Sequence, residues 1–203
     1  MYVFKCANLM PLEGLVNRMK TVKNILLVGV GGQGTILVSK VLTAGLMKAG
    51  YDVKMSEVHG MAQRGGSVTT QVRYGDKVYS PLIGKGMADI LVAFEKMEAV
   101  RWIEYLKPDG IVVVNNYEIP SLPIAIGKAE YPQGIMEALK NSFKTIEIDA
   151  AKVATELGNI KTQNIVLLGA LVKAFELTEV DWIEVLKESL LIFFQRKRKS
   201  GRR

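Results

Sequence analysis

The amino-acid sequence predicts an α/β domain in which helices cover a mixed, mainly parallel β-sheet. Three observations lead to this prediction. Short apolar runs of strand length alternate along the chain with amphipathic segments of helix length. A glycine-rich turn, VGVGGQG (28–34), joins the first such run to the first such segment. Of the 203 residues, 49% are apolar, which is ample for the core of one domain.

The first half of the domain is predicted to hold four strands and one helix. Branched apolar residues closed by glycines predict a buried strand over NILLVGV (24–30). Apolar positions at helical spacing predict a helix with one apolar face over 35–50. DVKMSEV (52–58) is predicted to be a short second strand. The alternating stretch 67–80, centred on a Gly-Asp pair, predicts two strands joined as a β-hairpin.

The second half continues the alternation of strands and helices. The segment 118–134 holds three of the six prolines and is predicted to be extended, without a helix. The other predicted elements are a strand over 88–95, a helix over 96–110, a strand over 111–116, a helix over 134–143, a strand over 144–150, and helices over 150–159, 164–178 and 181–194. The predicted architecture is a Rossmann-like three-layer domain with an inserted β-hairpin and a helical C-terminal layer.

The positive charge of the chain lies at its ends. Of the net charge of +7, six units come from the residues after 195, and residues 1–18 add one more, so residues 19–195 are formally neutral. A short basic tail is usually solvated, and we do not expect a nucleic-acid partner. The predicted organisation is an N-terminal extension (1–18), one domain (19–190) and a basic tail (191–203).

The chain is poor in metal ligands. It has one cysteine, Cys6, and one histidine, His59. An iron–sulfur cluster needs about four thiolates and a structural zinc site three or four Cys or His ligands, so this chain alone cannot build either. A single cysteine also fits a reducing, cytoplasmic compartment. No apolar run reaches the roughly 18 residues of a membrane span, so we expect a soluble protein without a membrane partner.

The glycine-rich turn is a candidate ligand site. Gly29, Gly31 and Gly34 satisfy the spacing G-x-G-x-x-G between a predicted strand and a predicted helix. Glycines allow close backbone approach, and free N–H groups at the start of a helix attract an anion. The turn also contains Gly32 and Gln33, and the Gln33 amide can both donate and accept a hydrogen bond.

The segment after the second predicted strand argues against a dinucleotide. Glu57 could imitate the acidic residue that binds a ribose in dinucleotide-binding domains. However, only about eight residues, His59 to Gly66, precede the next strand, whereas a parallel crossover takes about a dozen or more. Three hypotheses for the turn therefore stay open: a tight turn without a ligand, a site for a phosphate or CoA-type anion, or a site for NAD or FAD.

Four stretches together resemble a known family. They are NILLVGVGGQGTILVSKVL (24–42), SEVHGMAQRGGSVTTQVRYG (56–75), the P-L-I segment at 81–83 and T-x-N-x-x-L-L-G-A at 162–170. The chain resembles the beta subunits of indolepyruvate ferredoxin oxidoreductases and, more broadly, the gamma subunits or gamma domains of 2-oxoacid:ferredoxin oxidoreductases. The resemblance covers roughly residues 20 to 188, and the tail LLIFFQRKRKSGRR (190–203) departs from it.

The resemblance implies a reaction that several chains share. A 2-oxoacid, CoA and oxidised ferredoxin give an acyl-CoA, carbon dioxide and reduced ferredoxin. The resemblance places thiamine diphosphate, magnesium and the 4Fe-4S clusters on a larger partner subunit, through which ferredoxin would be reached. This chain would then bind none of these cofactors alone, carry no catalytic residue and be inactive alone; when isolated it could form a homodimer. Its single cysteine agrees independently.

The resemblance also suggests a role for the loop after the second strand. Polar donors between glycines suit an anion or a facing subunit. We therefore expect an interface, or the CoA side of a shared site, at Glu57, His59, Gln63, Arg64, Gly65, Gly66 and Ser67. Two alternatives to the subunit hypothesis stay open: a free-standing NAD- or FAD-binding oxidoreductase, and a non-enzymatic binding module of the same fold.

Overall fold

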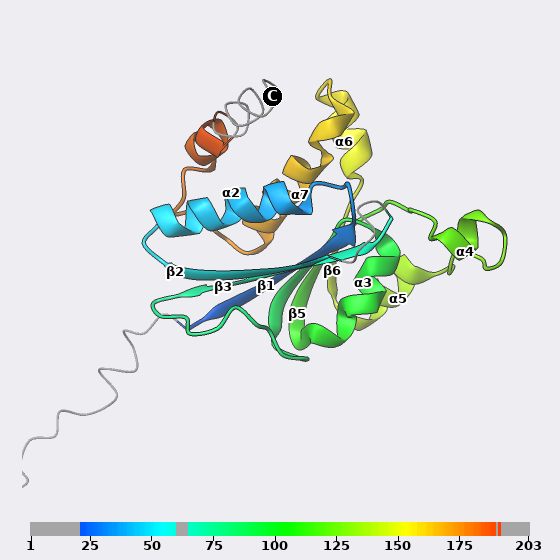
Figure 1. Ribbon diagram of the computed structural model, residues 1–203, viewed down its shortest axis with the longest axis horizontal. Coiled ribbons are helices and arrows are strands. Elements are labelled where there is room, and N and C mark those ends of the chain that lie inside the picture. Colours follow the sequence, from blue (N-terminus) through cyan, green and yellow to red (C-terminus); the bar gives the residue numbers. More distant parts are fainter. Residues whose placement is uncertain (1–20, 60–64, 190, 192–203) are drawn as a thin grey trace, which may run out of the picture.

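A computed structural model describes residues 21–59, 65–189 and 191 of the chain. These residues form one six-stranded sheet with helices on both faces, which confirms the predicted α/β class (Figure 1). The strand order is β2-β3-β1-β4-β5-β6. Their bounds are Lys23–Val30 for β1, Asp52–His59 for β2, Ser67–Gly75 for β3, Ala88–Ala93 for β4, Leu106–Asn115 for β5 and Lys144–Ile148 for β6.

The sheet is mixed. Strands β1, β4, β5 and β6 pair in parallel, whereas β3 is antiparallel to both β1 and β2. The connection from β2 to β3 is too short for a parallel crossover, so the two strands pair directly in antiparallel fashion. The antiparallel pair of β2 with β3 is not the hairpin predicted over residues 67–80.

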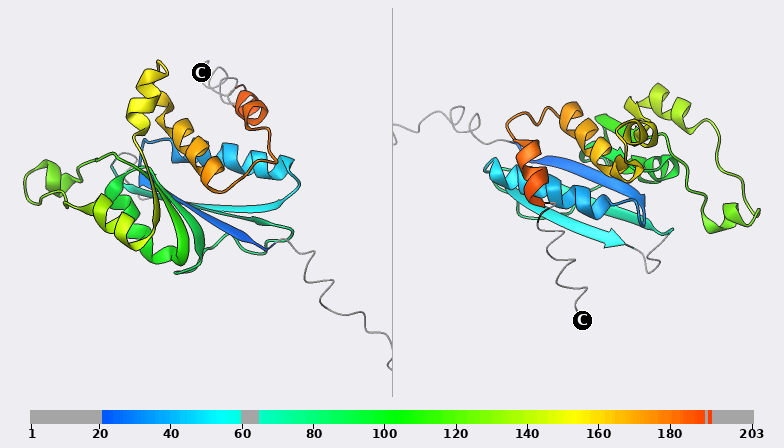
Figure 2. Two further views of the ribbon diagram at one scale, coloured as in Figure 1. Left: turned by 180° about the vertical axis from the view of Figure 1, so that it is seen from behind. Right: turned by 90° about the horizontal axis from the view of Figure 1, so that it is seen from above.

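The helices lie in two layers, as Figures 1 and 2 show from three directions. One layer contains α2 (Thr35–Lys48), α6 (Ala150–Glu156), α7 (Gln163–Ala174) and a helical segment over 182–189. The opposite layer contains α3 (Lys96–Trp102) and α5 (Ile135–Ser142). Three short elements complete the described chain: α4 (Leu122–Ala125) and the 3₁₀ turns η1 (Ile103–Tyr105) and η2 (Ile160–Thr162).

Alternation along the strands divides the core between the two layers. On β1, Ile25 and Leu27 pack toward α2 and α7, while Leu26 and Val28 pack toward α3 and α5. All four side chains are fully buried. Burial of such a side chain stabilises the fold by about 1.5–3 kcal/mol. The continuous apolar run therefore reflects a central strand that is covered on both faces.

The predicted hairpin over 67–80 is wrong in its second half. Both edges of β3 are occupied, one by β1 and the other by β2, so residues 76–80 have no edge of β3 to pair with. The Val78 N–H instead donates to Asp52 Oδ2 at 2.9 Å. The Arg73 guanidinium donates to the Ser80 carbonyl at 2.9 Å. These contacts hold the segment as an irregular loop.

Two further segments differ from the prediction. The helix predicted over 96–110 ends at Trp102, and β5 already begins at Leu106, because the Leu106 side chain is buried in the α3 and α5 core. The segment 118–134 contains the single-turn helix α4. Pro123 lies in its first turn, where proline is tolerated because the missing N–H has no partner in the helix.

Candidate functional site

The glycine-rich turn connects β1 to α2 in a left-handed conformation. Gly32 has φ 102° and Gly34 has φ 81°, a region that favours glycine. The Gly31 N–H donates to the Gly66 carbonyl at 2.8 Å. The turn therefore contacts the end of the loop between β2 and β3, and the two predicted site segments lie side by side at this point.

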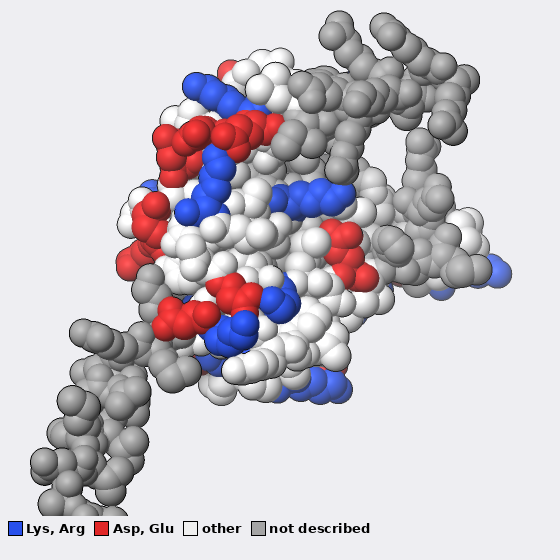
Figure 3. Space-filling model, turned by 60° about the vertical axis from the view of Figure 1, so that its left-hand side comes forward, with Lys and Arg blue, Asp and Glu red and all other residues white. Residues whose placement is uncertain are grey.

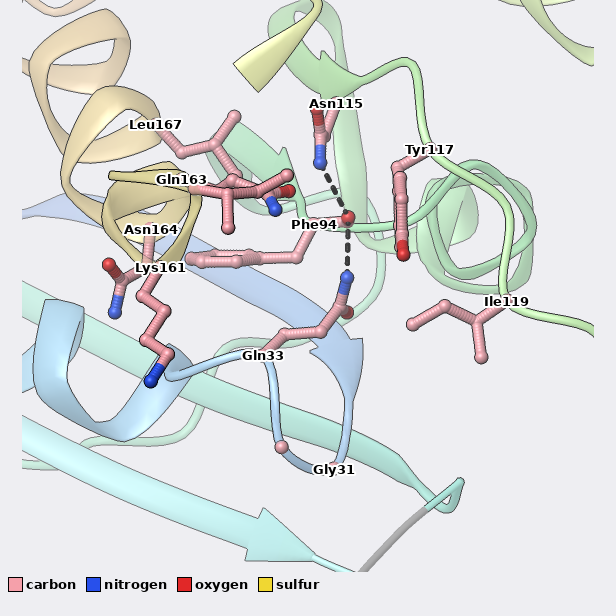
Figure 4. A pocket seen from close by; sticks show the side chains of 12 residues that line it. Gly31, Gln33, Phe94, Asn115, Tyr117, Ile119, Lys161, Gln163, Asn164 and Leu167 are labelled. Atoms are coloured by element: carbon pink, nitrogen blue, oxygen red, sulfur yellow. Dashed lines mark hydrogen bonds between the residues drawn. The ribbon is translucent and has the colours of Figure 1, made fainter. Parts of the chain in front are cut away.

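The Gln33 side chain braces the turn. Its Oε1 accepts from the Val30 N–H at 2.7 Å, and its Nε2 donates to the Phe94 carbonyl at 2.8 Å. Asn115 Nδ2 donates to the same carbonyl at 3.2 Å (Figure 4). Both ends of the Gln33 amide are thus engaged within the protein, and the turn is fixed against the end of β4.

A cleft of about 660 Å³ opens beside this brace. It lies at the carboxyl ends of β1, β4 and β5, where α2 and α3 leave for opposite faces of the sheet. Ligands of open α/β sheets bind at such a position. Figure 4 shows Lys161 and Asn164 on one side of the cleft and Tyr117 on the other. An ammonium, amides and an aromatic ring suit an anionic ligand with a planar or apolar portion.

Sequence reasoning missed most of this lining. Lys161, Asn164, Asn115 and Tyr117 line the cleft together with the predicted Gly31, Gly32 and Gln33. Asn164 stands in the motif at 162–170, and Asn115 is one of the last two residues of the strand predicted over 111–116, so both carried a signal. Their convergence depends on the order of the strands, which the sequence alone does not specify.

Glu57 lies away from the cleft. Strand β3 separates β2 from β1, and neighbouring strands are about 4.8 Å apart, which places Glu57 two strand spacings from the glycine turn. Its Oε1 accepts from the Oγ of the buried Ser39 on α2 at 2.9 Å. Glu57 thus anchors β2 to α2, and this position does not suit the ribose contact of a dinucleotide.

The described part of the predicted loop is tied to α3. Gly65 has φ 77°, and the Ser67 Oγ donates to Glu98 Oε2 at 2.5 Å. Residues 60–64, with Gln63 and Arg64, lie outside the described residues, as does the side chain of His59. The structure therefore places the two ends of the loop and leaves the roles of these three polar side chains as predictions.

Glu98 is a buried carboxyl beside the loop. The residue is 2% exposed, and burial raises the pKa of its carboxyl above the ordinary value of 4.5. The hydrogen bond from Ser67 and an ion pair with Arg101 Nη1 at 2.8 Å oppose this shift. A second buried carboxyl, Glu95, adds repulsion that raises the same pKa further.

Glu95 begins α3 and receives several donors. It is fully buried, and its Oε2 accepts from the Glu98 N–H at 2.9 Å as the N-cap of the helix. Its Oε1 accepts from the Ile119 N–H at 3.3 Å and from the Tyr131 hydroxyl. Burial raises the pKa of the Tyr131 hydroxyl, so this group remains a donor at neutral pH.

The described residues contain no group of three or more His, Cys, Asp or Glu side chains that could hold a metal ion. Among the helices described, none is long and apolar enough to cross a membrane. On the face drawn in Figure 3, acidic and basic side chains of the described surface are interspersed. This face therefore lacks the single-sign charge of a nucleic-acid-binding surface in its described part.

Comparisons with known proteins agree with this architecture. The family model described as pyruvate ferredoxin/flavodoxin oxidoreductase matches residues 24–201. The indolepyruvate oxidoreductase subunit IorB of Pyrococcus horikoshii is 42% identical over 173 residues, which cover 82% of this chain and 86% of that protein. The pyruvate/ketoisovalerate oxidoreductases common subunit gamma of Pyrococcus furiosus is 29% identical, covering 77% of this chain and 80% of that protein.

Solved structures share the fold. A 2-oxoglutarate:ferredoxin oxidoreductase from Magnetococcus marinus, with 2-oxoglutarate, coenzyme A and succinyl-CoA bound, matches with a TM-score of 0.63 and 25% identity. The match covers 88% of this chain but only 28% of that longer chain. Pyruvate oxidoreductase subunit PORC from Thermotoga maritima matches with a TM-score of 0.59 and 23% identity, covering 83% of this chain and 84% of that one. On the evidence of the family model and of the relatives above 40% identity, the chain belongs to the pyruvate ferredoxin/flavodoxin oxidoreductase family.

Proposed function

We propose that the chain is the subunit without redox cofactors of an arylpyruvate, in particular indolepyruvate, ferredoxin oxidoreductase. The complex would oxidatively decarboxylate the 2-oxoacid, join the acyl group to CoA and pass the electrons to ferredoxin. The single observation that carries this proposal is the sequence identity of 42% with an indolepyruvate oxidoreductase subunit over most of both chains.

The cofactors would belong to a larger partner subunit. With one cysteine in the whole sequence, the chain cannot supply the thiolates of a 4Fe-4S cluster. Thiamine diphosphate, bound with magnesium on the partner, would supply the carbanion chemistry of decarboxylation. This chain would complete the complex at the carboxyl end of its sheet and reach ferredoxin only through the partner.

The cleft beside the glycine turn is our candidate for the CoA side of the shared site. The Lys161 ammonium and the glycine backbone at Gly31 and Gly32, which line the cleft, suit a phosphate group. A relative of the same fold has coenzyme A bound, which supports CoA as a ligand of the complex. The chain's own residues would bind and orient CoA there, and none of them would act as an acid, a base or a nucleophile. Arg64 and Gln63, in the adjoining loop, would face the partner or the same ligand.

Reconstitution tests the proposal. The purified chain alone should not reduce a viologen with indolepyruvate and CoA, whereas the chain mixed with the large subunit of the same organism should. The large subunit alone is the control. Turnover by this chain alone, or full activity of the large subunit without it, would contradict the proposed division of labour.

A further inference from the structure

A segment between β5 and α5 stands away from the body of the protein. We call residues 119–130, which include α4, the arm. Figures 1 and 2 show α4 apart from the sheet and from both helical layers in each view. Two large apolar side chains lie at its tip: Leu122 is 73% exposed and Ile126 is 55% exposed.

The tip is apolar and already folded. No residue from Ile119 to Gly127 is charged. The Ile126 N–H donates to the Leu122 carbonyl at 3.1 Å, which closes one helical turn. Residues four apart on a helical turn are neighbours, so Leu122 and Ile126 form one apolar surface. Leu122 and Ile126 thus give the tip a small, uncharged apolar surface that is available to a partner.

Both roots of the arm are fixed to the start of α3. The buried Glu95 carboxylate accepts from the Ile119 N–H at 3.3 Å at one root and from the Tyr131 hydroxyl at the other. Beside it, Lys96 forms an ion pair with Glu118 at 2.5 Å. One buried carboxylate thus holds both ends, so the arm projects in a set direction and loses less freedom when it binds.

We propose that the arm docks, through Leu122 and Ile126, into an apolar socket on the larger subunit. This inference rests on the proposed function. In the 2-oxoglutarate enzyme the matched region is only 28% of a longer chain, so the equivalent domain belongs to a larger polypeptide. A separate chain has no covalent link to the rest of the complex, so it needs a docking surface of its own. The interfaces of permanent complexes are more apolar than those of transient complexes.

Two cavities of the described surface are candidate sockets for the arm of a second copy. The cleft beside α7 is lined by the polar groups of Gln33, Asn115 and Lys161 and also by apolar side chains, among them Phe94, Ile160 and Leu167. A smaller cavity, of about 310 Å³, is lined by Lys48, Asp181 and other charged residues. The smaller, charged cavity does not complement an uncharged apolar tip, and the proposed function assigns the cleft to CoA, so the larger subunit is favoured as the occupant.

The test measures binding of the full chain to the large subunit. The variant Leu122→Asp/Ile126→Asp should keep the melting temperature of the parent, because both side chains are exposed, and should lose affinity about 30-fold or more. Met47→Asp is the matched control, since Met47 is 63% exposed on α2, and it should bind like the parent. Should the aspartate variant fold poorly, Leu122→Ser/Ile126→Ser replaces it with the same expectation.

The outcomes separate the hypotheses. Binding of a folded arm variant within about threefold of the parent would overturn the arm's role and leave the proposed function intact. A loss of affinity in Met47→Asp as large as that in the arm variant would also overturn the arm's role. Failure of the parent chain to bind the large subunit would remove the proposed function and the arm's assignment with it. A homodimer of the parent that the arm variant dissolves would assign the arm to a second copy instead.

Discussion

Gly32 and Gly34 share a left-handed backbone but differ in their surroundings. A Cβ on Gly32 would meet no atom within 4 Å, whereas a Cβ on Gly34 would overlap the Asn164 side-chain amide of α7. Asn164 lines the cleft, so Gly34 is the residue that lets the start of α2 approach this wall. Both glycines have a positive φ, but only Gly34 is in close contact with a neighbour. Comparing substitutions at the two positions therefore separates the cost of backbone strain from the cost of the contact.

We predict that Gly34→Ala lowers the free energy of unfolding more than Gly32→Ala does. Each substitution costs about 1 kcal/mol for a positive φ, and Gly34→Ala adds about 0.5–1.5 kcal/mol for turning the Asn164 amide out of its position. Urea denaturation measures both. The additional loss of unfolding free energy in Gly34→Ala should become smaller when Asn164→Ala is added. Equal losses of unfolding free energy in Gly32→Ala and Gly34→Ala would contradict the close contact between Gly34 and Asn164.

Gln33 is predicted to stabilise the turn rather than to bind a ligand. Gln33→Ala would leave the Val30 N–H without its partner, which costs about 1–3 kcal/mol for a buried group, and would leave the Phe94 carbonyl with only the weaker Asn115 donor. Gln163→Ala, at the same cleft and without a side-chain hydrogen bond in the described structure, is the control and should change stability by less than about 0.5 kcal/mol. Similar stabilities for the two variants would refute the brace.

At the scale of elements, α3 positions both segments expected to meet other molecules. Glu98 holds Ser67, where the loop between β2 and β3 ends, and Glu95 holds both roots of the arm. Two buried carboxyls on one short helix repel each other, and this repulsion raises the pKa of Glu98 together with its burial. The first turn of α3 is therefore sensitive to pH.

We predict that Glu98 destabilises the fold as pH rises. Its pKa is higher in the folded than in the unfolded chain, so the folded state holds the proton longer. The contribution of Glu98 to stability is full below its ordinary pKa of 4.5 and is lost as pH rises through the folded pKa. Urea denaturation of the parent and of Glu98→Gln should show the parent's relative stability falling from pH 4.5 toward neutral. If the unfolding free energy of the parent relative to Glu98→Gln stays constant or rises with pH, the contacts of Glu98 with Arg101 and Ser67 outweigh the effect of its burial.

The elements also show what the sequence can and cannot predict. The apolar run of β1 and the helical spacing of α2 are local patterns, and both elements formed where predicted. Residues 76–80 alternate like a strand but cannot pair, because β1 and β2 already occupy both edges of β3. The same limit applies to the cleft: Asn115 at the end of β5 and Lys161 in η2 meet there only because the fold brings both segments to the glycine turn. Competition for an edge and convergence across the sheet are not local properties.

At the scale of the whole molecule, the candidate site segments gather at one end of the sheet. The glycine turn, the cleft, the described ends of the loop and the roots of the arm all lie at the carboxyl ends of the parallel strands (Figure 1). Tyr117 and Ile119 connect two of these features, since both line the cleft and Ile119 begins the arm. A partner docked on the arm would therefore lie next to any ligand in the cleft.

This arrangement leads to a kinetic prediction for the reconstituted complex. If the cleft holds the phosphate groups of CoA, Lys161→Ala should raise the KM for CoA about tenfold and leave kcat nearly unchanged, because a charged contact remote from the reacting thiol stabilises substrate and transition state equally. Lys161→Arg keeps the positive charge and should recover most of the affinity.

Lys173→Ala, in the last turn of α7 and outside the cleft lining, is the matched control and should behave like the parent. Steady-state viologen reduction with varied CoA measures all three variants. A KM for CoA that is the same in Lys161→Ala and Lys173→Ala would move the CoA site out of this cleft. A loss of kcat in Lys161→Ala would show instead that the lysine acts after CoA has bound.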